Sequence, residues 1–590
     1  MSRFAGRVAR TPQAALTAQP APLLRDGLQV LLRGFIGNRQ TLLREGRAMG
    51  LIGEHEDDAA LCAVAYRRWG ADLNAHVLGE YAVALFDPAA QTLLLTRDGL
   101  GLQPLFYSGD GERLAFASHL DALLTIVEPG ALDTRYLGEH LTFAPHAFDR
   151  TPFVNIAKLI PGHSLRWTPG RLEQIRSWRL SQAPDVPDAT DREHEARFRE
   201  LLAEGLRQCI PATGRTWSEL SGGQDSSSIV CAAADAGITG LETLSFVFPH
   251  CPEADETPYI EAVTARTGYP AHRLDIQQTP PFARVPTTFH GEPNLVLPYT
   301  AFIERYEDLM REHDVQVMLS GNGGDHVMIG DGLFPLDLAD HLQRGDGRAL
   351  WQGLKDWQAH AEHRRSLRFL FGHYAWTPAW RHWRRQPVSP RFTIPVPEWI
   401  APDFLRRFRA AAADARCEPP DHGSSPSRQY FIERVHDFSA LISQNAHQAV
   451  RGFEFRYPLM YRPLVEFLYA LPWRQKLRPD GDRHLQRRAM HALLPAEVRD
   501  RVDKAVMTRP VLEGFRHSPA WFDLLTRQPQ LIEQGLVDAA RWQDAVRRAR
   551  LGQIEGVSLF LAAAALESWL QGLRAHRADR PAANPAVVGI

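Results

Sequence analysis

The sequence contains few cysteines and no motif that would pair them. Among its 590 residues are five scattered cysteines, Cys62, Cys209, Cys231, Cys251 and Cys417, and none belongs to a C-x-x-C pair. This excludes a disulfide framework and a structural zinc site of the usual spacing. We therefore expect a reducing, cytoplasmic setting in which each cysteine is a small buried side chain. The 24 histidines show no H-E-x-x-H spacing either.

Long apolar runs, a strong net charge and a kinase-type phosphate loop are also absent. No stretch approaches the roughly 20 apolar residues of a membrane-spanning helix, and the basic start of the chain lacks the apolar core of a secretory signal. The formal net charge is -2 and 23% of the residues are charged. We therefore expect a protein that binds neither nucleic acid nor membrane. No Gly-x-x-x-x-Gly-Lys-Ser/Thr motif is present.

What the sequence does contain is a glycine- and serine-rich loop, Ser221-Gly222-Gly223-Gln224-Asp225-Ser226-Ser227, between a predicted strand at 216–220 and an alanine-rich helix at 229–236. Adjacent glycines let the backbone approach a ligand, and the N–H groups at a helix start favour a phosphate. Asp225 places a carboxylate in this anion-binding loop, which favours a divalent cation between it and the phosphates. The loop predicts an ATP and Mg²⁺ site rather than an ordinary Gly-Ser turn.

A second loop repeats this order of elements. Leu319-Ser320-Gly321-Asn322-Gly323-Gly324-Asp325 follows an apolar strand predicted at 315–319. The carboxyl ends of parallel strands meet at one edge of a sheet, where ligands bind. We therefore expect Asp225 and Asp325 to hold one Mg²⁺ between them.

The chain is too long for a single hydrophobic core, and its pattern changes near residue 185. Upstream, short strands predict two hairpins, 80–87 with 92–96 and 105–107 with 114–117. Downstream, a capping box at Thr190 and Glu193 opens a helix. Apolar runs then alternate with helices, which predicts a parallel sheet covered on both faces. Beyond about residue 335 the pattern is mainly helical, and we expect residues 576–590 to form a disordered tail.

Together with later motifs, the two loops resemble the asparagine synthetase B superfamily over nearly the whole chain. The synthetase motifs continue with Glu454-Phe455-Arg456-Tyr457-Pro458-Leu459 and with Lys504 after Arg501-Val502-Asp503. The glutaminase motifs are Trp69-Gly70, the run 78–87, Arg97-Asp98 and the run 101–105. The resemblance implies an α/β protein: an Ntn-hydrolase-like αββα sandwich over residues 1–185, then an adenine-nucleotide α-hydrolase-like (PP-loop) parallel-sheet domain with a helical C-terminal part over residues 190–575.

The resemblance also implies a reaction. A carboxylate attacks the α-phosphate of ATP, pyrophosphate leaves, and an amine converts the acyl-adenylate into an amide. Mg²⁺ would lie on Asp225 and Asp325, Lys504 would stabilise charge in both half-reactions, and Glu454 would act as a general base. Without the motif, Lys504 would be interpreted as a solvated helix lysine. The residues implied to bind the nucleotide are Ser221, Gly222, Gly223, Asp225, Ser226, Ser227, Ser245, Val247, Gly321 and Gly323.

Two departures set this chain apart from true asparagine synthetases. The glutaminase of those enzymes needs an N-terminal cysteine, whereas this chain begins Met1-Ser2-Arg3-Phe4. Arg33-Gly34-Phe35 stands where the family has Asn-Gly-Glu, so the asparagine that supports the oxyanion is replaced. In the second loop, Asn322 and His326 replace acidic residues. We expect the N-terminal domain to have lost glutamine hydrolysis and to brace the synthetase or form part of its binding surface.

A synthetase without its own ammonia supply needs another amine. These traits are similar to β-lactam synthetases and, more closely, to lasso peptide cyclases. We therefore expect an Asp or Glu side-chain carboxylate of a precursor peptide to be joined to the peptide's own α-amine, with a leader peptidase and a leader-binding protein as candidate partners. The alternatives are an ammonia-dependent asparagine synthetase, a β-lactam-synthetase-like ligase on a small molecule, a catalytically silent scaffold, and an enzyme that adenylates RNA.

One segment, residues 351–387, matches no motif of the family. It combines five tryptophans with six arginines. Aromatic faces with interleaved arginine can hold a peptide or a single strand of nucleic acid. A helical hairpin that buries its tryptophans and leaves a solvated basic face explains the pattern equally well.

Overall fold

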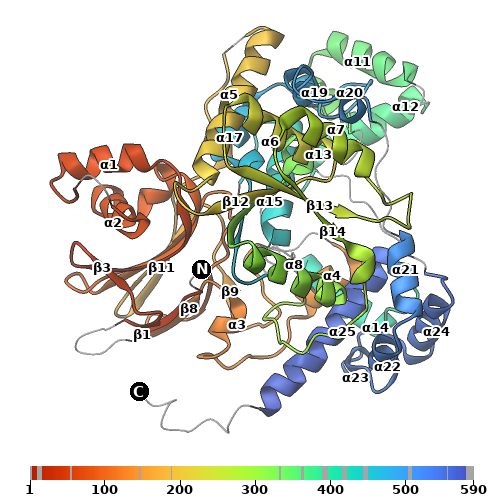
Figure 1. Ribbon diagram of the computed structural model, residues 1–590, viewed down its shortest axis with the longest axis horizontal. Helices are drawn as coiled ribbons and strands as arrows, with labels where there is room; N and C mark the ends of the chain where they lie inside the picture. Colours follow the sequence, from red (N-terminus) through yellow and green to blue (C-terminus); the bar gives the residue numbers. More distant parts are fainter. Residues whose placement is uncertain are drawn as a thin grey trace.

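The structure is a computed structural model in which a β-rich N-terminal part lies beside a larger part built on one parallel sheet (Figure 1). The predicted mixed α/β class is confirmed. In the residues described here, no helix is both long enough and apolar enough to cross a membrane. The described residues are 3–9, 16–53, 56–144, 148–187, 189–330, 334–360, 365–388, 396–414, 421–442, 450–501, 508–554 and 556–579.

The N-terminal part contains two antiparallel sheets, ordered β2-β1-β8-β7-β9 and β11-β10-β6-β5-β4-β3. The two predicted hairpins are confirmed as the antiparallel pairs β5–β6 and β7–β8. The strands are β1 (Ala5–Ala9), β2 (Thr17–Gln19), β3 (Leu23–Arg25), β4 (Leu28–Ile36), β5 (Gly79–Asp87), β6 (Thr92–Arg97), β7 (Phe106–Gly109), β8 (Arg113–Ala117), β9 (Ala157–Lys158), β10 (His163–Thr168) and β11 (Arg171–Arg176).

Apolar side chains from both sheets fill the space between them, among them Phe4, Leu31, Phe116 and Trp167. Helices α1 (Arg39–Ala48) and α2 (Asp58–Trp69) cover the other face of the six-stranded sheet. Strand β5 is therefore buried on both faces, which explains its nearly continuous apolar sequence. This layering matches the predicted sandwich. Two shorter helices, α3 (Leu120–Leu123) and α4 (Thr134–Thr142), follow the second hairpin.

The second part is built on a parallel sheet in the order β14-β13-β12-β15-β16. Helices α5, α6 and α7 lie on one face and α8 on the other (Figure 1). Because β12 and β15 are neighbours, the loops that follow them emerge side by side at the carboxyl edge. The bounds are β12 (Arg215–Glu219), β13 (Leu241–Val247), β14 (Ala271–Asp275), β15 (Val315–Leu319), β16 (Glu454–Arg456), α5 (Asp191–Cys209), α6 (Gln224–Asp235), α7 (Thr257–Thr267) and α8 (Thr300–Glu312).

Local signals set several of these helix ends. The hydroxyl of Thr190 accepts from the backbone N–H of Glu193 and the Glu193 carboxylate accepts in return, which confirms the predicted capping box of α5. Gly268 ends α7 with a φ of 71°, a conformation that glycine adopts without strain.

The remaining described chain is mainly helical, as predicted. Its last helix packs in one core with α4 of the N-terminal part, so the two parts share apolar contacts. These helices are α9 (Gly324–Val327), α10 (Asp337–Gln343), α11 (Gly347–Ala359), α12 (Leu367–Leu370), α13 (Thr377–Trp383), α14 (Pro402–Asp414), α15 (Pro426–Ile442), α17 (Arg462–Ala470), α18 (Trp473–Lys476), α19 (His484–Ala489), α20 (Ala496–Arg499), α21 (Thr508–Arg516), α22 (Pro519–Thr526), α23 (Gln530–Glu533), α24 (Ala539–Arg550) and α25 (Val557–Ala578).

Helix α25 corrects the predicted start of the disordered tail. Residues 576–578 belong to this helix, because its apolar face stays packed in the core as far as Leu573 and one more turn follows. Residues 580–590 lie outside the described part of the chain. Cys62, Cys209, Cys231 and Cys251 are buried, as expected, whereas Cys417 lies outside the described residues.

In the segment 351–387, one tryptophan is buried and four are exposed. Trp357 packs into the core, whereas Trp351, Trp376, Trp380 and Trp383 are 51%, 57%, 43% and 77% exposed. The interpretation of a hairpin with all its tryptophans buried is therefore wrong. Trp357 lies on the buried face of α11 together with Leu350, Gly353 and Leu354.

Candidate active site

The first loop closes on itself through its serine hydroxyl groups. Ser226 Oγ accepts from the backbone N–H of Ser221 at 3.1 Å, and the two hydroxyls lie 3.0 Å apart. Gly222 has a φ of 70°, and a Cβ there would lie 2.5 Å from the Cβ of Tyr259. Gly223 caps α6 without a side chain, so the helix start presents backbone N–H groups to the loop. This geometry suits a phosphate.

The second loop packs directly against the first. A Cβ on Gly321 would lie 2.9 Å from the backbone nitrogen of Ser226, and a Cβ on Gly324 would lie 2.5 Å from Cγ of Asp225. Gly323 adopts a φ of 94° at the start of α9. The glycines of this loop are therefore required by close contact as well as by backbone conformation.

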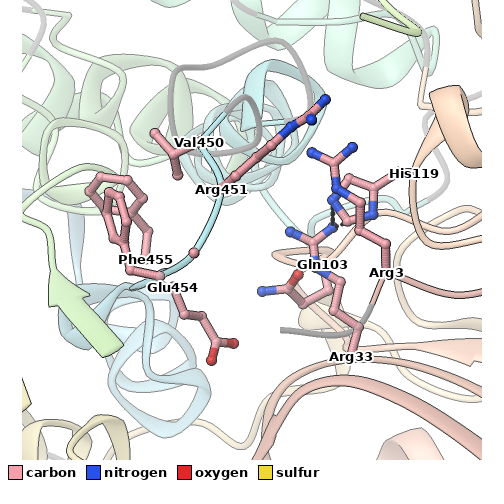
Figure 2. A pocket seen from close by; sticks show the side chains of 10 residues that line it. Arg3, Arg33, Gln103, His119, Val450, Arg451, Glu454 and Phe455 are labelled. Carbon is pink, nitrogen blue, oxygen red and sulfur yellow. Dashed lines mark hydrogen bonds between the residues drawn. The ribbon is translucent and has the colours of Figure 1, made fainter. Parts of the chain in front are cut away.

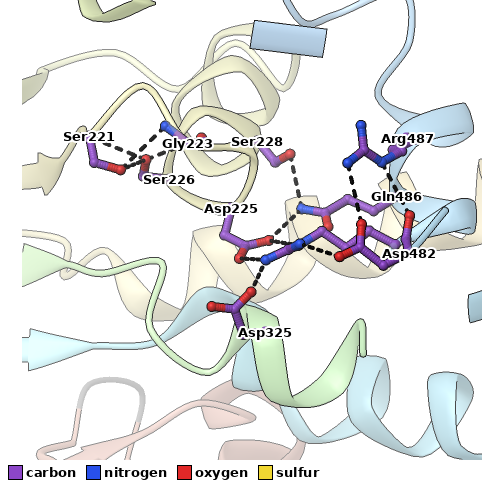
Figure 3. A network of polar contacts seen from close by, with 10 residues as sticks. Ser221, Gly223, Asp225, Ser226, Ser228, Asp325, Asp482, Gln486 and Arg487 are labelled. Atoms are coloured by element: carbon purple, nitrogen blue, oxygen red, sulfur yellow. Dashed lines mark hydrogen bonds and ion pairs between the residues drawn. The ribbon is translucent and has the colours of Figure 1, made fainter. Parts of the chain in front are cut away.

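The structure brings Asp225 and Asp325 together on one guanidinium group (Figure 3). Arg483 donates from Nε and Nη2 to the two carboxylate oxygens of Asp225, both at 3.3 Å, and its Nη2 also pairs with Asp325. Gln486 adds a bond from Nε2 to Asp225 Oδ1 at 3.0 Å. The Arg483 side chain is only 7% exposed. A cation therefore already bridges the two carboxylates in this state.

Glu219 connects the strand that precedes the first loop with the second loop. It ends β12, and its carboxylate accepts from Ser320 Oγ at 2.7 Å and from the Tyr306 hydroxyl at 3.2 Å. Burial raises the pKa of Glu219 to about 7, although the two hydrogen bonds act in the opposite direction. The sequence analysis did not identify this residue. The one signal was its position two residues before Ser221, where the first loop begins.

Strand β13 runs beside the first loop. The backbone N–H of Leu220 donates to the Leu244 carbonyl at 2.8 Å, so Ser245 and Val247 continue along the loop edge. Ser245 is fully buried, and its Oγ has no hydrogen-bond partner in the described chain; the same holds for Ser227 Oγ. Both hydroxyls therefore retain bonding capacity at the site.

Glu454 occupies a different place from the nucleotide loops. It lies on β16, its Oε2 accepts from Arg456 Nη2 at 3.1 Å, and it lines a cavity between the two parts of the chain (Figure 2). The N-terminal sheet is fixed there because Glu80 on β5 accepts from the backbone N–H of Tyr457 at 2.8 Å. No described contact joins Glu454 to Asp225 or Asp325.

Lys504 lies outside the described residues. Among the described residues, Arg499 lies beside the first loop, since Gln224, the first residue of α6, donates to the Arg499 carbonyl at 3.4 Å. Arg501, three residues before Lys504, pairs with Glu256.

The residues of the two loops fit a magnesium nucleotide. Mg²⁺ is usually held by one or two carboxylates together with substrate phosphates rather than by a full protein cage. The described residues contain no group of three or more His, Cys, Asp or Glu that could hold a metal alone. The site offers two carboxylates from adjacent loops, beside hydroxyls and helix N–H groups that can hold phosphates. This donor set matches Mg²⁺ that is shared between the protein and the nucleotide.

Comparison with known proteins agrees with this geometry. The sequence matches the asparagine synthase family over residues 197–571 and the glutamine amidotransferase domain over residues 6–178. Asparagine synthetase (glutamine-hydrolyzing) 3 of Bacillus subtilis is 23% identical over 583 residues, which cover 88% of each chain. Amidase chyE of Penicillium rubens is 24% identical over 306 residues, which cover 48% of this chain and 44% of that protein.

The first of these matches extends over well more than half of the chain and includes both glycine loops, β16 and α19. The two carboxylates, the serine hydroxyls and the helix start thus lie within the part that performs ATP-dependent amide formation in that family. The chain therefore belongs to the asparagine synthase family of ATP-dependent amide-forming ligases.

Proposed function

We propose that this ligase uses ATP and Mg²⁺ to adenylate an Asp or Glu side-chain carboxylate of a precursor peptide and then closes a macrolactam with the peptide's own α-amine. The observation that carries the adenylation step is the meeting of Asp225 and Asp325 at the carboxyl edge of the parallel sheet. The precursor peptide is the required partner. A leader peptidase and a leader-binding protein are further candidate partners.

In the first half-reaction, a carboxylate oxygen of the substrate forms a bond to the α-phosphorus and pyrophosphate leaves. Ser221, Gly223 and Ser226 would hold the pyrophosphate through hydroxyl and backbone N–H groups. Mg²⁺, held by Asp225 and Asp325, would supply charge neutralisation at the phosphates. Arg483 lies between these carboxylates and would turn toward the phosphates when the nucleotide binds.

In the second half-reaction, the amine nitrogen bonds to the acyl carbon and the bond from that carbon to AMP breaks. The proton released by the amine passes to Glu454, whose Oε1 has no described hydrogen-bond partner. Lys504 would stabilise the negative charge that develops. A peptide α-amine has a pKa of about 7.7–8.0, so deprotonation at neutral pH costs only about 1 kcal/mol.

Two features support a peptide as the substrate. Arg33, on β4, replaces the asparagine that supports the oxyanion in glutaminases of this family, so ammonia from glutamine is not the expected amine. The exposed tryptophans of 351–387 lie among arginines, with Arg384 over the Trp380 ring at 5.2 Å. Such a surface can hold a peptide away from the reacting atoms and orient it.

The second candidate is an ammonia-dependent asparagine synthetase, or a β-lactam-synthetase-like ligase acting on a small molecule. The name of the B. subtilis relative favours the first of these. The two candidate functions differ in their acyl substrate. The macrocyclase activates a peptide side chain, whereas the second candidate activates free aspartate or another small carboxylate.

The test incubates the full chain with ATP, Mg²⁺ and leaderless candidate peptides, and follows pyrophosphate release and peptide mass. We expect loss of one water from a peptide that contains Asp or Glu at a ring-forming position. Pyrophosphate release and amide formation with free aspartate and ammonium, with no mass change in any peptide, would contradict the proposal.

A further inference from the structure

A cavity of about 350 Å³ separates the N-terminal sheets from the edge of the parallel sheet (Figure 2). The N-terminal side contributes Arg3, Arg33, Gln103 and His119, and the opposite wall is the segment 450–455 that leads into β16. Of these residues the proposed mechanism uses only Glu454. A volume near the lower limit of ordinary ligand sites, roughly 300–1,000 Å³, suits an amino-acid-sized group.

The charged residues that line the cavity are mostly cationic. They are three arginines, Arg3, Arg33 and Arg451, and one acid, Glu454, which pairs with Arg456. The guanidinium groups of these arginines gather near His119 in Figure 2. Arg33 Nη1 lies 3.0 Å from Nδ1 of His119. The cavity therefore has a positive wall that attracts an anionic group.

The histidine does not add to this charge. Burial, and then the proximity of Arg33, Arg3 and Arg451, hold the pKa of His119 well below its ordinary value, so the ring is neutral near pH 7. Burial also lowers the pKa of Arg33 to about 10, which still leaves it a cation at that pH. Arg3 forms an ion pair with Asp121, just outside the cavity.

Two buried side-chain oxygen atoms of residues that line the same cavity receive no hydrogen bond from the described residues. Oε1 of Gln103 and Oε1 of Glu454 have no hydrogen-bond partner in the part of the chain that the structure describes. Gln103 is 2% exposed and Glu454 is 8% exposed. A buried acceptor without a partner is destabilising, so each would gain from a donor placed in the cavity. An amine is such a donor.

We propose that this cavity binds the amine substrate of the ligase and recognises a carboxylate that the same substrate carries. Its amine donates to the acceptors of Glu454 and Gln103, and its carboxylate accepts from the arginines. Guanidinium groups match the geometry of a carboxylate and form charge-assisted hydrogen bonds with it. The inference rests on the proposed function, because it takes Glu454 as the group beside the reacting amine.

Ammonia does not match this cavity. A molecule of the size of water occupies about 30 Å³, roughly a tenth of the volume present. The same cavity accommodates either a carboxylate of the precursor peptide or a free amino acid, which would belong to the small-molecule alternative, and the test separates these two sources.

The experiment measures binding to the full chain by calorimetry at constant ionic strength. The probes are glycylglycine and glycylglycinamide, then a candidate peptide with a free carboxyl terminus and its C-terminally amidated form. We expect the carboxylate form of a pair to bind at least tenfold more tightly, about the effect of one charge-assisted hydrogen bond. Arg33→Met and Arg451→Met should each reduce that preference about tenfold. The exposed Arg547→Met on α24 is the matched control and should retain it.

A preference seen with glycylglycine identifies a free amino acid or short peptide as the source, and one seen only with the long peptide identifies the peptide's own carboxylate. Equal binding of the carboxylate and amide forms in both pairs would overturn the proposal. So would a preference that survives in both arginine variants. Arg451 is exposed, so its variant keeps the test valid if Arg33→Met does not fold.

Pyrophosphate release with the same peptides is measured in parallel. Its absence would count against the proposed peptide ligase, whereas the carboxylate preference is decided by the binding data alone.

Discussion

Asp225 and Asp325 lie on different loops, 100 positions apart in the chain, and share the guanidinium group of Arg483. Two carboxylates that face one site repel each other unless a cation lies between them. In the structure an internal arginine fills that role, and during catalysis a magnesium nucleotide would take it over. The arrangement predicts a competition between Arg483 and Mg²⁺.

The first prediction concerns that competition. Arg483→Met removes the guanidinium group that pairs with Asp225 and Asp325. The loss of this partner should destabilise the protein by about 1–3 kcal/mol in metal-free buffer. Mg²⁺ should then raise the Tm of the variant more than that of the parent protein, because it binds the vacated carboxylates. Differential scanning fluorimetry with and without MgCl₂ measures this. Arg547→Met serves as the exposed control, and an equal Mg²⁺ effect in all three proteins would contradict the competition.

The second prediction tests the close contact of the loops. A Cβ on Gly324 would lie 2.5 Å from Cγ and 2.8 Å from Oδ2 of Asp225, so Gly324→Ala must push the loops apart. A displacement of about 1 Å in a catalytic site lowers the rate roughly 100-fold. We therefore expect the kcat/KM of Gly324→Ala for ATP to fall by about that factor. Gly347→Ala is the control, since a Cβ there meets no atom within 4 Å. Unchanged kinetics in Gly324→Ala would mean that the loops do not act as one site.

The third prediction concerns pH and Glu219. Burial raises its pKa to about 7 from an ordinary value of 4.5, so its neutral form is favoured in the folded protein. The contribution of protonated Glu219 to the stability of the folded protein is complete below pH 4.5. It is lost as the pH rises toward and through 7. Glu219→Gln, which cannot ionise, should therefore be more stable than the parent protein at pH 8, by on the order of 3 kcal/mol.

Urea unfolding of both proteins at several pH values between 4.5 and 8 measures this difference. We expect it to grow from pH 4.5 to 7 and to level off above. A difference that is constant over this range would show that Glu219 does not titrate as described.

The fourth prediction concerns the N-terminal part. Arg33 places a guanidinium group beside His119 where an oxyanion-supporting asparagine would stand in a glutaminase. We expect no release of glutamate from glutamine, with or without ATP, in an assay that follows glutamate directly. Glutamine hydrolysis at a rate that matches amide formation would show that this part still supplies ammonia.

Local sequence was sufficient to predict the elements that carry the site. Both loops were recognisable because each has glycines and a carboxylate after a short strand. Strand β15 ends where expected, and β12 ends one residue earlier than expected, at Glu219. The capping box at Thr190 was equally local. Such features depend on neighbouring residues, so a single sequence contains their signal.

The partners of these elements could not be predicted in the same way. Arg483 reaches Asp225 across 258 positions, and no periodicity or spacing indicates that contact. Glu219 was missed because its role depends on Ser320 and Tyr306, which come from two other elements. The tryptophans at 376, 380 and 383 have a helical spacing that is the same for a buried face and for an exposed one. Whether the face is buried depends on the packing of neighbouring elements, and here all three are exposed.

The most direct test of the account is ATP–pyrophosphate exchange in the presence of an active acyl substrate, which reports adenylate formation alone. Asp225→Asn and Asp325→Asn keep the size of each side chain and remove its charge. We expect each to lower the exchange rate by roughly 100-fold or more, while Asp523→Asn, exposed on α22, leaves it unchanged. Exchange at the parent rate in either loop variant would contradict the claim that the two carboxylates hold the nucleotide.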